Sequence, residues 1–294
     1  MRRSSGLTKK LTPWILLLPS LIFLMLFTFY PIIKTVYLSF YNSEMGISEP
    51  FFVGFDNFSR MMKDEIFWKV LKNNILFAIG TVPLGVGLGL LMAILINRAI
   101  RWNGFVKTFF FYPVVIPIIA VANIWLFIYT PEYGMLNQLL SVFGIDSINV
   151  MGQTNTVLIG MIVMLVWKEA GFFMIFYLAG LQNVPKELYE ASMIDGASGW
   201  YRFRKITFPL IMPTTLFVMI IAITNAFKLV DHLVVMTQGG PDNASNLLLY
   251  YIYENAFKFM DHGMAATLTL VMLVLLVIIS SIQFFSVDRK IHYN

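Results

Sequence analysis

Six long apolar runs limit what this sequence can fold into. They cover residues 14–33, 75–96, 109–129, 156–178, 206–230 and 265–285. A helix of roughly 20 apolar residues crosses the roughly 30 Å of hydrocarbon in a bilayer. Charged residues make up only 13% of the 294 positions, whereas a soluble domain carries about a quarter. The sequence therefore predicts an all-α membrane protein with six transmembrane helices.

The basic residues indicate the orientation of these helices. If the N-terminus is cytoplasmic, the inner segments are residues 1–13, 97–108, 179–205 and 286–294, and they hold 13 Lys and Arg in 61 positions. The outer segments hold 6 in 101 positions. Because Lys and Arg concentrate in cytoplasmic loops, both termini are expected in the cytoplasm. The net charge of +5 then reflects topology, and nucleic acid is not expected as a partner.

This topology predicts an order of segments along the chain. A cytoplasmic N-terminus (1–13) precedes a retained anchor helix with an extracytoplasmic loop (14–74), because the first run is too long for a signal peptide and no small-x-small cleavage site follows it. A core domain (75–285) and a cytoplasmic tail (286–294) follow. Within the second run, Gly85, Gly89 and Ala93 form a stripe of small residues on which another helix can pack closely.

No catalytic or metal-binding pattern is visible in the sequence. There is no Walker A loop, the three histidines are scattered, and there is no cysteine. Without these groups, neither ATP binding of the P-loop kind nor a zinc site is expected. The sequence favours a chain that is not an enzyme, with no catalytic residues and no metal ligands.

The loop between the fourth and fifth runs, residues 182–209, carries a distinctive pattern. Pro185 suits the first turn of a helix and Gly196 suits its end. Glu187 and Glu190 lie three residues apart, on one face of that helix and near its N-terminal end, where the helix dipole favours anions. Leu188, Ala191 and Ile194 repeat at the same spacing on another face. This amphipathic helix is either a solvated loop helix or a docking helix for a partner.

The same loop resembles a known signature. Glu190-Ala191-Ser192, three residues, Gly196, nine residues and then 206–209 (Ile-Thr-Phe-Pro) is similar to the EAA signature of binding-protein-dependent ABC importer permeases, with Ser192 and Phe208 as mild departures. An N-terminal Leu-Leu-Pro-Ser, the segment 52–58 and Gly-Gly-Pro at 239–241 extend the resemblance to the sugar-importer branch. They indicate the first of its two permease subunits, of the maltose and glycerol-phosphate type.

The resemblance implies a type I ABC importer transmembrane domain in a bacterial or archaeal inner membrane. Its implied partners are a second permease subunit, two cytoplasmic ATPase subunits and an extracytoplasmic solute-binding protein. No cofactor is implied for this chain, because ATP and Mg would bind to the ATPases. The residues implied to couple to the ATPases are Glu187, Glu190, Ala191, Ser192, Asp195 and Gly196.

Polar residues within the runs are candidates for a substrate path, because charges at membrane depth are costly and usually face a cavity. The residue types suit a sugar, with aromatic faces for rings and polar groups for hydroxyls. Their alternative role is to hold helices together, for example through Lys168–Asp231 or Lys228–Glu169 pairs. The candidates are Trp167, Lys168, Glu169, Phe172, Asn225, Lys228 and Asp231.

The resulting hypothesis is a permease subunit of an ATP-driven importer that moves a sugar or sugar-like solute by alternating access. The alternatives are a permease for another solute, such as a glycerol phosphoester, and a self-sufficient secondary transporter. A secondary transporter would not need the EAA helix, so the 182–209 loop argues against it.

Overall fold

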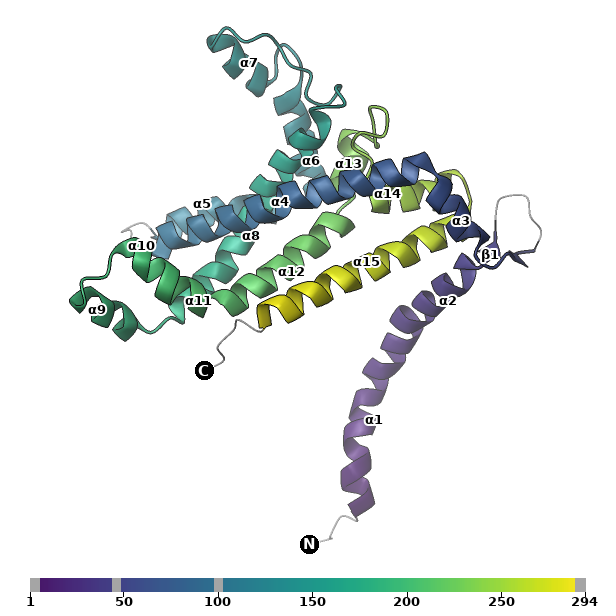
Figure 1. Cartoon of the computed structure of the whole chain (residues 1–294), viewed down its shortest axis with the longest axis horizontal. Coiled ribbons are helices and arrows are strands. Elements are labelled where there is room, and N and C mark those ends of the chain that lie inside the picture. The colour runs from purple at the N-terminus through teal and green to yellow at the C-terminus, as the bar shows by residue number, and fades with distance from the viewer. Residues whose placement is uncertain (1–5, 44–48, 98–102, 289–294) are drawn as a thin grey trace. The chain divides into compact units, whose positions relative to one another are not determined.

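The computed structural model is mostly helical and describes residues 6–43, 49–97 and 103–288 (Figure 1). The chain divides into two units, residues 1–63 with 252–273 and residues 64–251 with 274–294. The predicted cytoplasmic segments 1–13 and 286–294 fall partly outside the described residues, at positions 1–5 and 289–294.

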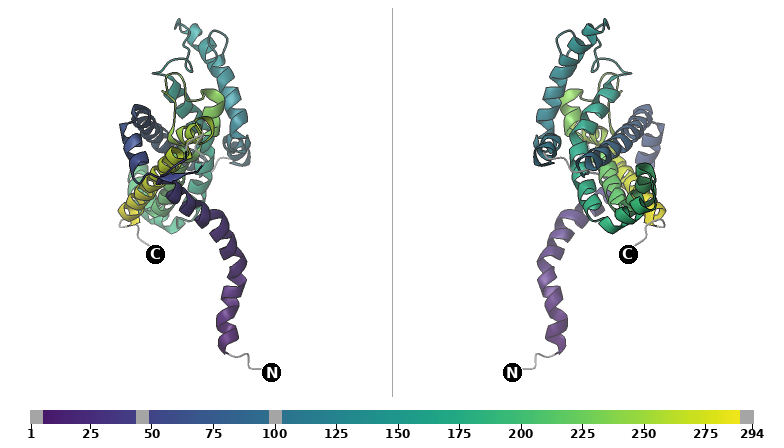
Figure 2. Two further views of the ribbon diagram at one scale, coloured as in Figure 1. Left: turned by 90° about the vertical axis from the view of Figure 1, so that its right-hand side faces the viewer. Right: turned by 90° about the vertical axis from the view of Figure 1, so that its left-hand side faces the viewer.

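The first unit begins with a long helical rod, visible in Figure 2 as the purple segment. It consists of α1 (Gly6–Leu24), the π-helical turn η1 (Met25–Phe29) and α2 (Tyr30–Ser39). Its apolar side chains are exposed, for example Trp14 at 65% and Phe27 at 72%. Such a surface is suited to lipid, where exposed apolar side chains carry no hydrophobic penalty.

Short elements complete the first unit. Strand β1 (Tyr41–Asn42) pairs antiparallel with β2 (Phe51–Phe52), with Tyr41 opposite Phe52. Helix α3 (Asp56–Lys63), the turn η3 (Glu254–Lys258) and the first part of α15 (His262–Asp288) follow. Asn57 donates from its amide to the Ser39 and Tyr41 carbonyls at 2.9 and 3.0 Å, which fixes the end of the rod against α3.

The second unit holds most of the helices. Those before the 182–209 loop, named the coupling loop below after the role its sequence implies, are α4 (Glu65–Asn97), α5 (Asn103–Val115), α6 (Ile118–Tyr129), α7 (Met135–Val142) and α8 (Val157–Gln182). Those in and after the loop are α9 (Lys186–Ile194), α10 (Gly199–Arg202), η2 (Phe203–Thr207), α11 (Phe208–Leu210), α12 (Met212–Lys228) and α13 (Asp231–Met236). The chain passes between the two units in α14 (Leu248–Tyr253) and again within α15.

Helices α4 and α8 form the centre of the second unit and pack closely. A Cβ on Gly89 would lie 2.7 Å from the Cβ of Phe173 and 3.0 Å from the Ala170 carbonyl oxygen. One turn further along α4, Ala93 is fully buried. The close helix contact predicted from the stripe of small residues is therefore confirmed, because a larger side chain at Gly89 would force the two helices apart.

The third apolar run differs from its prediction. Residues 109–129 were expected to form one span, but the structure has two helices, α5 and α6, bent by 96°. The break falls at Pro117, which lies just before α6 and has φ −54° and ψ 138°. Proline has no backbone N–H to continue the ladder of α5 and restricts the residue before it, so the helix ends there.

Five described helical segments are long and apolar enough to cross a membrane, and α5 with α6 makes a sixth if the bent pair is one span. The five are Thr12–Ser39, Glu65–Asn97, Val157–Gln182, Met212–Met236 and His262–Phe285. This agrees with the predicted all-α fold and with its six apolar runs.

Candidate functional site

The coupling loop, residues 182–209, forms a short helix with a well-defined end. Helix α9 follows Pro185 and ends at Ile194. Gly196 has φ +73°, and its N–H donates to the Met193 carbonyl at 3.1 Å while the Ala197 N–H reaches back to the Ser192 carbonyl at 2.9 Å. This pair of bonds is a Schellman motif, which needs a residue in the left-handed conformation and so favours glycine.

Most of the predicted coupling residues lie on the surface of this loop. Ser192 is the exception: it is 9% exposed, and its hydroxyl donates to the Tyr189 carbonyl at 2.8 Å. The remaining five are exposed: Glu187, Glu190, Ala191, Asp195 and Gly196. In the part of the chain that the structure describes, none of the three acids has a salt-bridge partner. The apolar face is also open, with Leu188 43% and Ile194 87% exposed.

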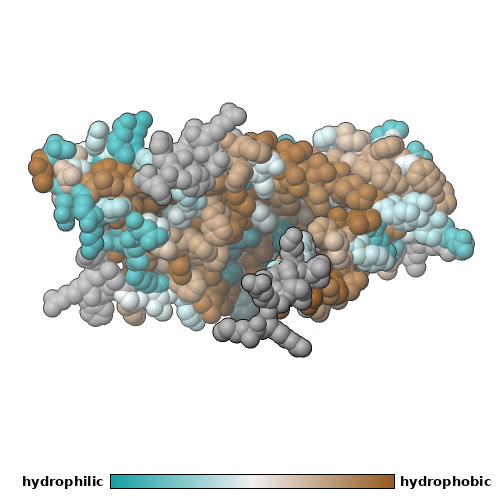
Figure 3. All heavy atoms as spheres, turned by 90° about the horizontal axis from the view of Figure 1, so that it is seen from below, coloured by the Kyte–Doolittle hydropathy of each residue, from teal (hydrophilic) through white to brown (hydrophobic). Residues whose placement is uncertain are grey.

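A groove of about 720 Å³ runs between α9 and the segment that follows it. Ala191, Ser192, Asp195 and Gly196 line one side of it, and Tyr201 lies on the other. Hydrophilic residues gather at the left end of the face shown in Figure 3, where α9 and α10 lie. The loop therefore presents acidic, small and apolar groups together, which is a surface suited to a protein partner.

One contact that the sequence did not reveal holds this loop together. The Tyr189 hydroxyl and the Thr207 hydroxyl lie 2.8 Å apart, which ties α9 to η2. The residues are 18 positions apart in the sequence. Tyr189 lies outside the EAA signature and Thr207 is at a variable position within it, so no local pattern pointed to this contact.

Lys168 lies at the break between α5 and α6. It is 7% exposed, and its ammonium donates to the carbonyls of Pro113, Val114 and Ile116 at 3.0, 3.0 and 2.9 Å. Pro117 has no N–H to give to the Pro113 carbonyl, and the bend leaves the neighbouring carbonyls without helical donors. Three ammonium protons meet three carbonyls, so Lys168 stabilises the bent pair of helices.

Glu169, the next residue, lies at the contact between α8 and α12. Its carboxylate accepts a hydrogen bond from the Asn225 amide at 2.7 Å. The two side chains line a small cavity with Thr81 and Phe173. Its volume is about 10 Å³, which is room for about one water molecule, so the space beside this polar pair is closed in this structure.

Aromatic rings continue from this polar pair along α8. Phe172 meets Phe176 edge-on with ring centres 4.9 Å apart, and Phe176 meets Phe217 of α12 at 5.1 Å. Of these rings, only Phe172 was predicted as a site residue. Phe176 follows it by one helical turn, so helical spacing was a signal that could have identified it.

The other candidates lie elsewhere. Trp167 packs edge-on against Trp125 of α6 at 5.8 Å. Lys228 and Asp231 are exposed, at the end of α12 and the start of α13. Neither ion pair considered from the sequence, Lys168–Asp231 or Lys228–Glu169, forms among the described residues. The structure thus brings together Glu169 and Asn225 beside the aromatic rings, and it separates them from Trp167 and Lys168.

The loop of residues 237–247 is called the outer loop, after the side of the membrane that the sequence predicts for it, and side chains of α4 hold it. The Asn73 amide donates to the Asn243 and Asn246 carbonyls at 2.7 and 3.1 Å. Asn74 is fully buried and accepts from the Leu248 N–H at 3.0 Å while donating to the Ala226 carbonyl at 3.4 Å. These hydrogen bonds from α4 fix the loop and the start of α14 that follows it.

A bundle of membrane-length helices with an exposed amphipathic loop helix is the arrangement expected of a membrane transport subunit. The family described as "Binding-protein-dependent transport system inner membrane component" matches residues 85–292. The chain belongs to this family and is an ABC importer permease subunit, with the type I importer permease fold.

Relatives and a solved structure agree with this assignment over nearly the whole chain. The probable ABC transporter permease YurN of Bacillus subtilis is 33% identical over 96% of this chain and 98% of its own length. The sn-glycerol-3-phosphate permease UgpA of Agrobacterium fabrum is 32% identical over 97% of each. A chain of a bacterial alginate ABC importer superposes with a TM-score of 0.85 at 25% identity, covering 97% of this chain and 99% of that one.

Proposed function

We propose that this permease subunit moves a sugar or a sugar-like solute into the cytoplasm by alternating access, and that ATP is hydrolysed by separate subunits. The single observation that carries the proposal is the exposed EAA loop, whose three acids have no partner within the described chain. An exposed apolar face rimmed by charged residues is typical of a surface that binds another protein.

The proposed partners are inferred from this loop and from the relatives. Two ATPase subunits bind ATP and Mg on the cytoplasmic side, and one of them receives α9, with Glu190 paired to a basic group. A second permease subunit completes the pathway. A soluble binding protein delivers the solute from outside, as in the alginate transporter solved with a periplasmic protein that holds an alginate pentasaccharide. The present chain contributes no catalytic residue and binds no cofactor.

The proposed location is the inner membrane of a bacterium or archaeon, with both termini in the cytoplasm. The concentration of Lys and Arg in the segments on the side of the coupling loop supports this orientation.

The substrate path is proposed to pass Glu169, Asn225 and Phe172. An amide and a carboxylate can bind hydroxyl groups, and aromatic rings can stack on sugar faces. Lys228 and Asp231 belong to the path at its outer end. Lys168 and Trp167 act beside it, because the Lys168 ammonium is fully occupied by backbone carbonyls.

A sugar is favoured over a glycerol phosphoester, the second candidate. The phosphoester is suggested by the UgpA relatives, whose names specify sn-glycerol-3-phosphate. The polar pair in the described bundle, however, carries the Glu169 carboxylate, which would repel a phosphate. Relatives named for lactose and for starch degradation products agree with a neutral solute.

The first test is to tag the chain, purify it gently from its native membrane and identify the proteins that accompany it. We expect a homologous permease and an ATPase at two copies per complex, together with ATP-dependent uptake in liposomes. A lone polypeptide that transports without ATP would contradict the proposal and favour a secondary transporter.

The substrate path is tested with Asn225→Ala and Glu169→Ala. Each variant removes one side of the 2.7 Å contact, so we expect uptake to fall roughly tenfold, the effect of losing one charge-assisted hydrogen bond, while the complex still assembles. Asn123→Ala is the matched control, because the exposed Asn123 bonds only within its own helix. Failure of assembly in either path variant would show that the pair holds helices together instead.

A further inference from the structure

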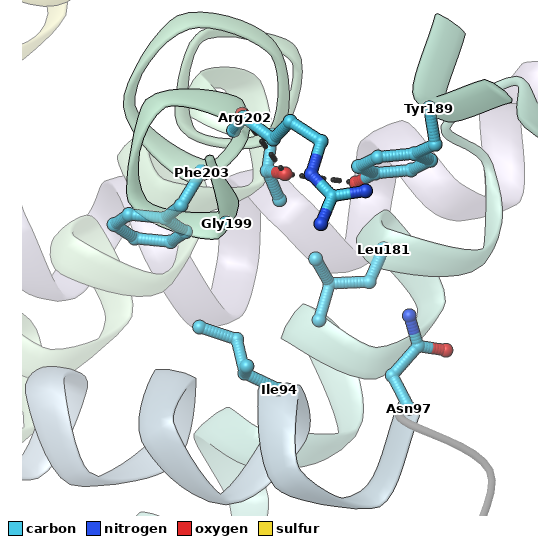
Figure 4. A pocket seen from close by; sticks show the side chains of 8 residues that line it. Ile94, Asn97, Leu181, Tyr189, Gly199, Arg202 and Phe203 are labelled. Carbon is cyan, nitrogen blue, oxygen red and sulfur yellow. Dashed lines mark hydrogen bonds between the residues drawn. The ribbon is translucent and has the colours of Figure 1, made fainter. Parts of the chain in front are cut away.

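A polar cavity of about 200 Å³ lies beside α9, where the ends of α4 and α8 meet α10 and η2. Figure 4 shows it with the Arg202 guanidinium between Tyr189 and Leu181, and with Asn97 on the α4 side. All of its walls belong to the second unit.

The charge of this cavity is uncompensated. Arg202 forms no salt bridge with any described residue, and no acidic side chain lines the cavity. Arg204 and Lys205 follow on the surface and add to the positive potential. A guanidinium offers a planar fork of N–H donors that suits a phosphate, and the Asn97 amide can add further donors. The cavity is therefore suited to an anion that carries a phosphate group.

An apolar groove of about 430 Å³ adjoins this cavity along α4. The two hollows share Ile94, Gly199 and Phe203 in their walls. The groove extends along α4 as far as Gly87. On α4 the groove is lined from Gly87 to Ile94 and the cavity from Ile94 to Asn97. Together they span about 15 Å of helix, which is about the depth of one leaflet of a bilayer.

An aromatic pair marks the junction of the cavity and the groove. Trp200 is 71% exposed, and its ring stacks on that of Phe203 at 5.7 Å. Tryptophan concentrates at the level of lipid headgroups. The charged cavity thus lies at headgroup level and the apolar groove at acyl-chain level.

We propose that this composite site binds one anionic phospholipid of the cytoplasmic leaflet, with its phosphate on Arg202 and an acyl chain along α4 in the groove. A positively charged cavity continues into an apolar groove, and together they are about one leaflet deep. This continuity matches a lipid, whereas a soluble anion would leave the groove empty. Such a lipid touches α4, α9 and α10 together, so it stabilises the coupling loop against the membrane helices. The site goes beyond the proposed function, because it requires a bilayer but no particular solute.

The test is native mass spectrometry of the purified complex with phosphatidylglycerol and, for comparison, zwitterionic phosphatidylcholine. The wild type is expected to retain phosphatidylglycerol preferentially. Arg202→Gln should weaken this binding roughly tenfold or more, since a charge-assisted contact is lost. The matched control is Arg204→Gln, which removes the same charge two positions away outside the cavity and should change binding less than about twofold. Equal loss in both variants would overturn the proposal.

A second variant tests the groove itself. A Cβ on Gly87 would meet nothing within 4 Å, so Gly87→Leu fills the groove without moving the backbone, and it should abolish retention of phosphatidylglycerol. Inorganic phosphate serves as the free-anion probe. If phosphate competes fully with phosphatidylglycerol and Gly87→Leu has no effect, the site binds a soluble anion and the lipid proposal fails. If Gly87→Leu instead releases the second permease, the groove is a subunit interface and the proposal fails as well. Uptake of solute by the wild type is measured in parallel. If the wild type transports solute, failure of the lipid proposal leaves the importer assignment intact.

Discussion

The outer loop (237–247) and the coupling loop (182–209) differ in whether their polar groups find partners within the chain. The outer loop is bound to α4 of the same chain by Asn73 and a 2.7 Å Lys69–Asp242 salt bridge, and Asn74 of α4 binds Leu248, the residue that follows the loop. The coupling loop is fixed by its own Schellman turn and by the Tyr189–Thr207 contact, and its acids have no partner in the described chain. The outer loop is held by contacts within the chain. The coupling loop is also folded by contacts within the chain, but its acidic side chains are available to a partner.

The largest expected effect comes from reversing a charge in the coupling loop. Glu190→Lys should leave the chain in the membrane but abolish uptake and ATPase coupling. A buried ion pair across a subunit interface costs about 3–5 kcal/mol to break, which corresponds to more than about a hundredfold in affinity. Uptake and ATPase rates in proteoliposomes measure the loss.

The control for this variant is an equal charge reversal at an exposed acid outside the loop. Asp146→Lys changes the exposed segment between α7 and α8 and should leave both rates within about twofold, as expected for a surface charge. Normal uptake by Glu190→Lys would contradict the assignment of the coupling loop.

A smaller effect is expected from removing a buried side chain of α4 that binds other segments of the same chain. Asn74→Leu removes the partners of the Leu248 N–H and the Ala226 carbonyl, both held by a fully buried amide. Each unsatisfied group costs about 1–3 kcal/mol, so we expect a loss of about 2–4 kcal/mol in the free energy of unfolding, measured by thermal or denaturant unfolding of the complex. Asn123→Ala, an exposed asparagine bonded within its own helix, should change it by less than about 0.5 kcal/mol. Equal stabilities would mean that the outer loop is not fixed by α4.

The two loops also differ in how far the sequence predicts them. The helix after Pro185 and its glycine end at Gly196 follow from local rules, and the structure has them at those positions. The contacts of Asn73 and Asn74 join residues more than 150 positions apart, and no local pattern encodes such pairs. The Gly-Gly-Pro at 239–241 supported the family resemblance, but it did not indicate the side chains that hold the loop.

Contacts between distant residues also limited what the sequence could predict in the membrane-length helices. The sequence placed Lys168 and Glu169 together as costly charges, but it could not separate their roles. Their partners, the α5 carbonyls and Asn225, lie 52 to 56 positions away. The sharp bend at Pro117 is equally non-local, because the proline permits the break while the Lys168 ammonium supplies the donors that the bent backbone lacks.

The smallest expected effect concerns the exposed salt bridge of the outer loop. The Lys69 and Asp242 side chains are 40% and 77% exposed, and such pairs contribute about 0–1 kcal/mol. Asp242 also has φ +48°, which asparagine tolerates well and alanine does not. Asp242→Asn should therefore lower the free energy of unfolding by less than about 0.5 kcal/mol, and Asp242→Ala by about 1 kcal/mol more. Adding salt should shrink the first difference and leave the second unchanged, because screening acts on charge and not on backbone strain. If Asp242→Asn and Asp242→Ala were equally damaging, the salt bridge that both variants lose, and not the shape of the turn, would hold this end of the loop.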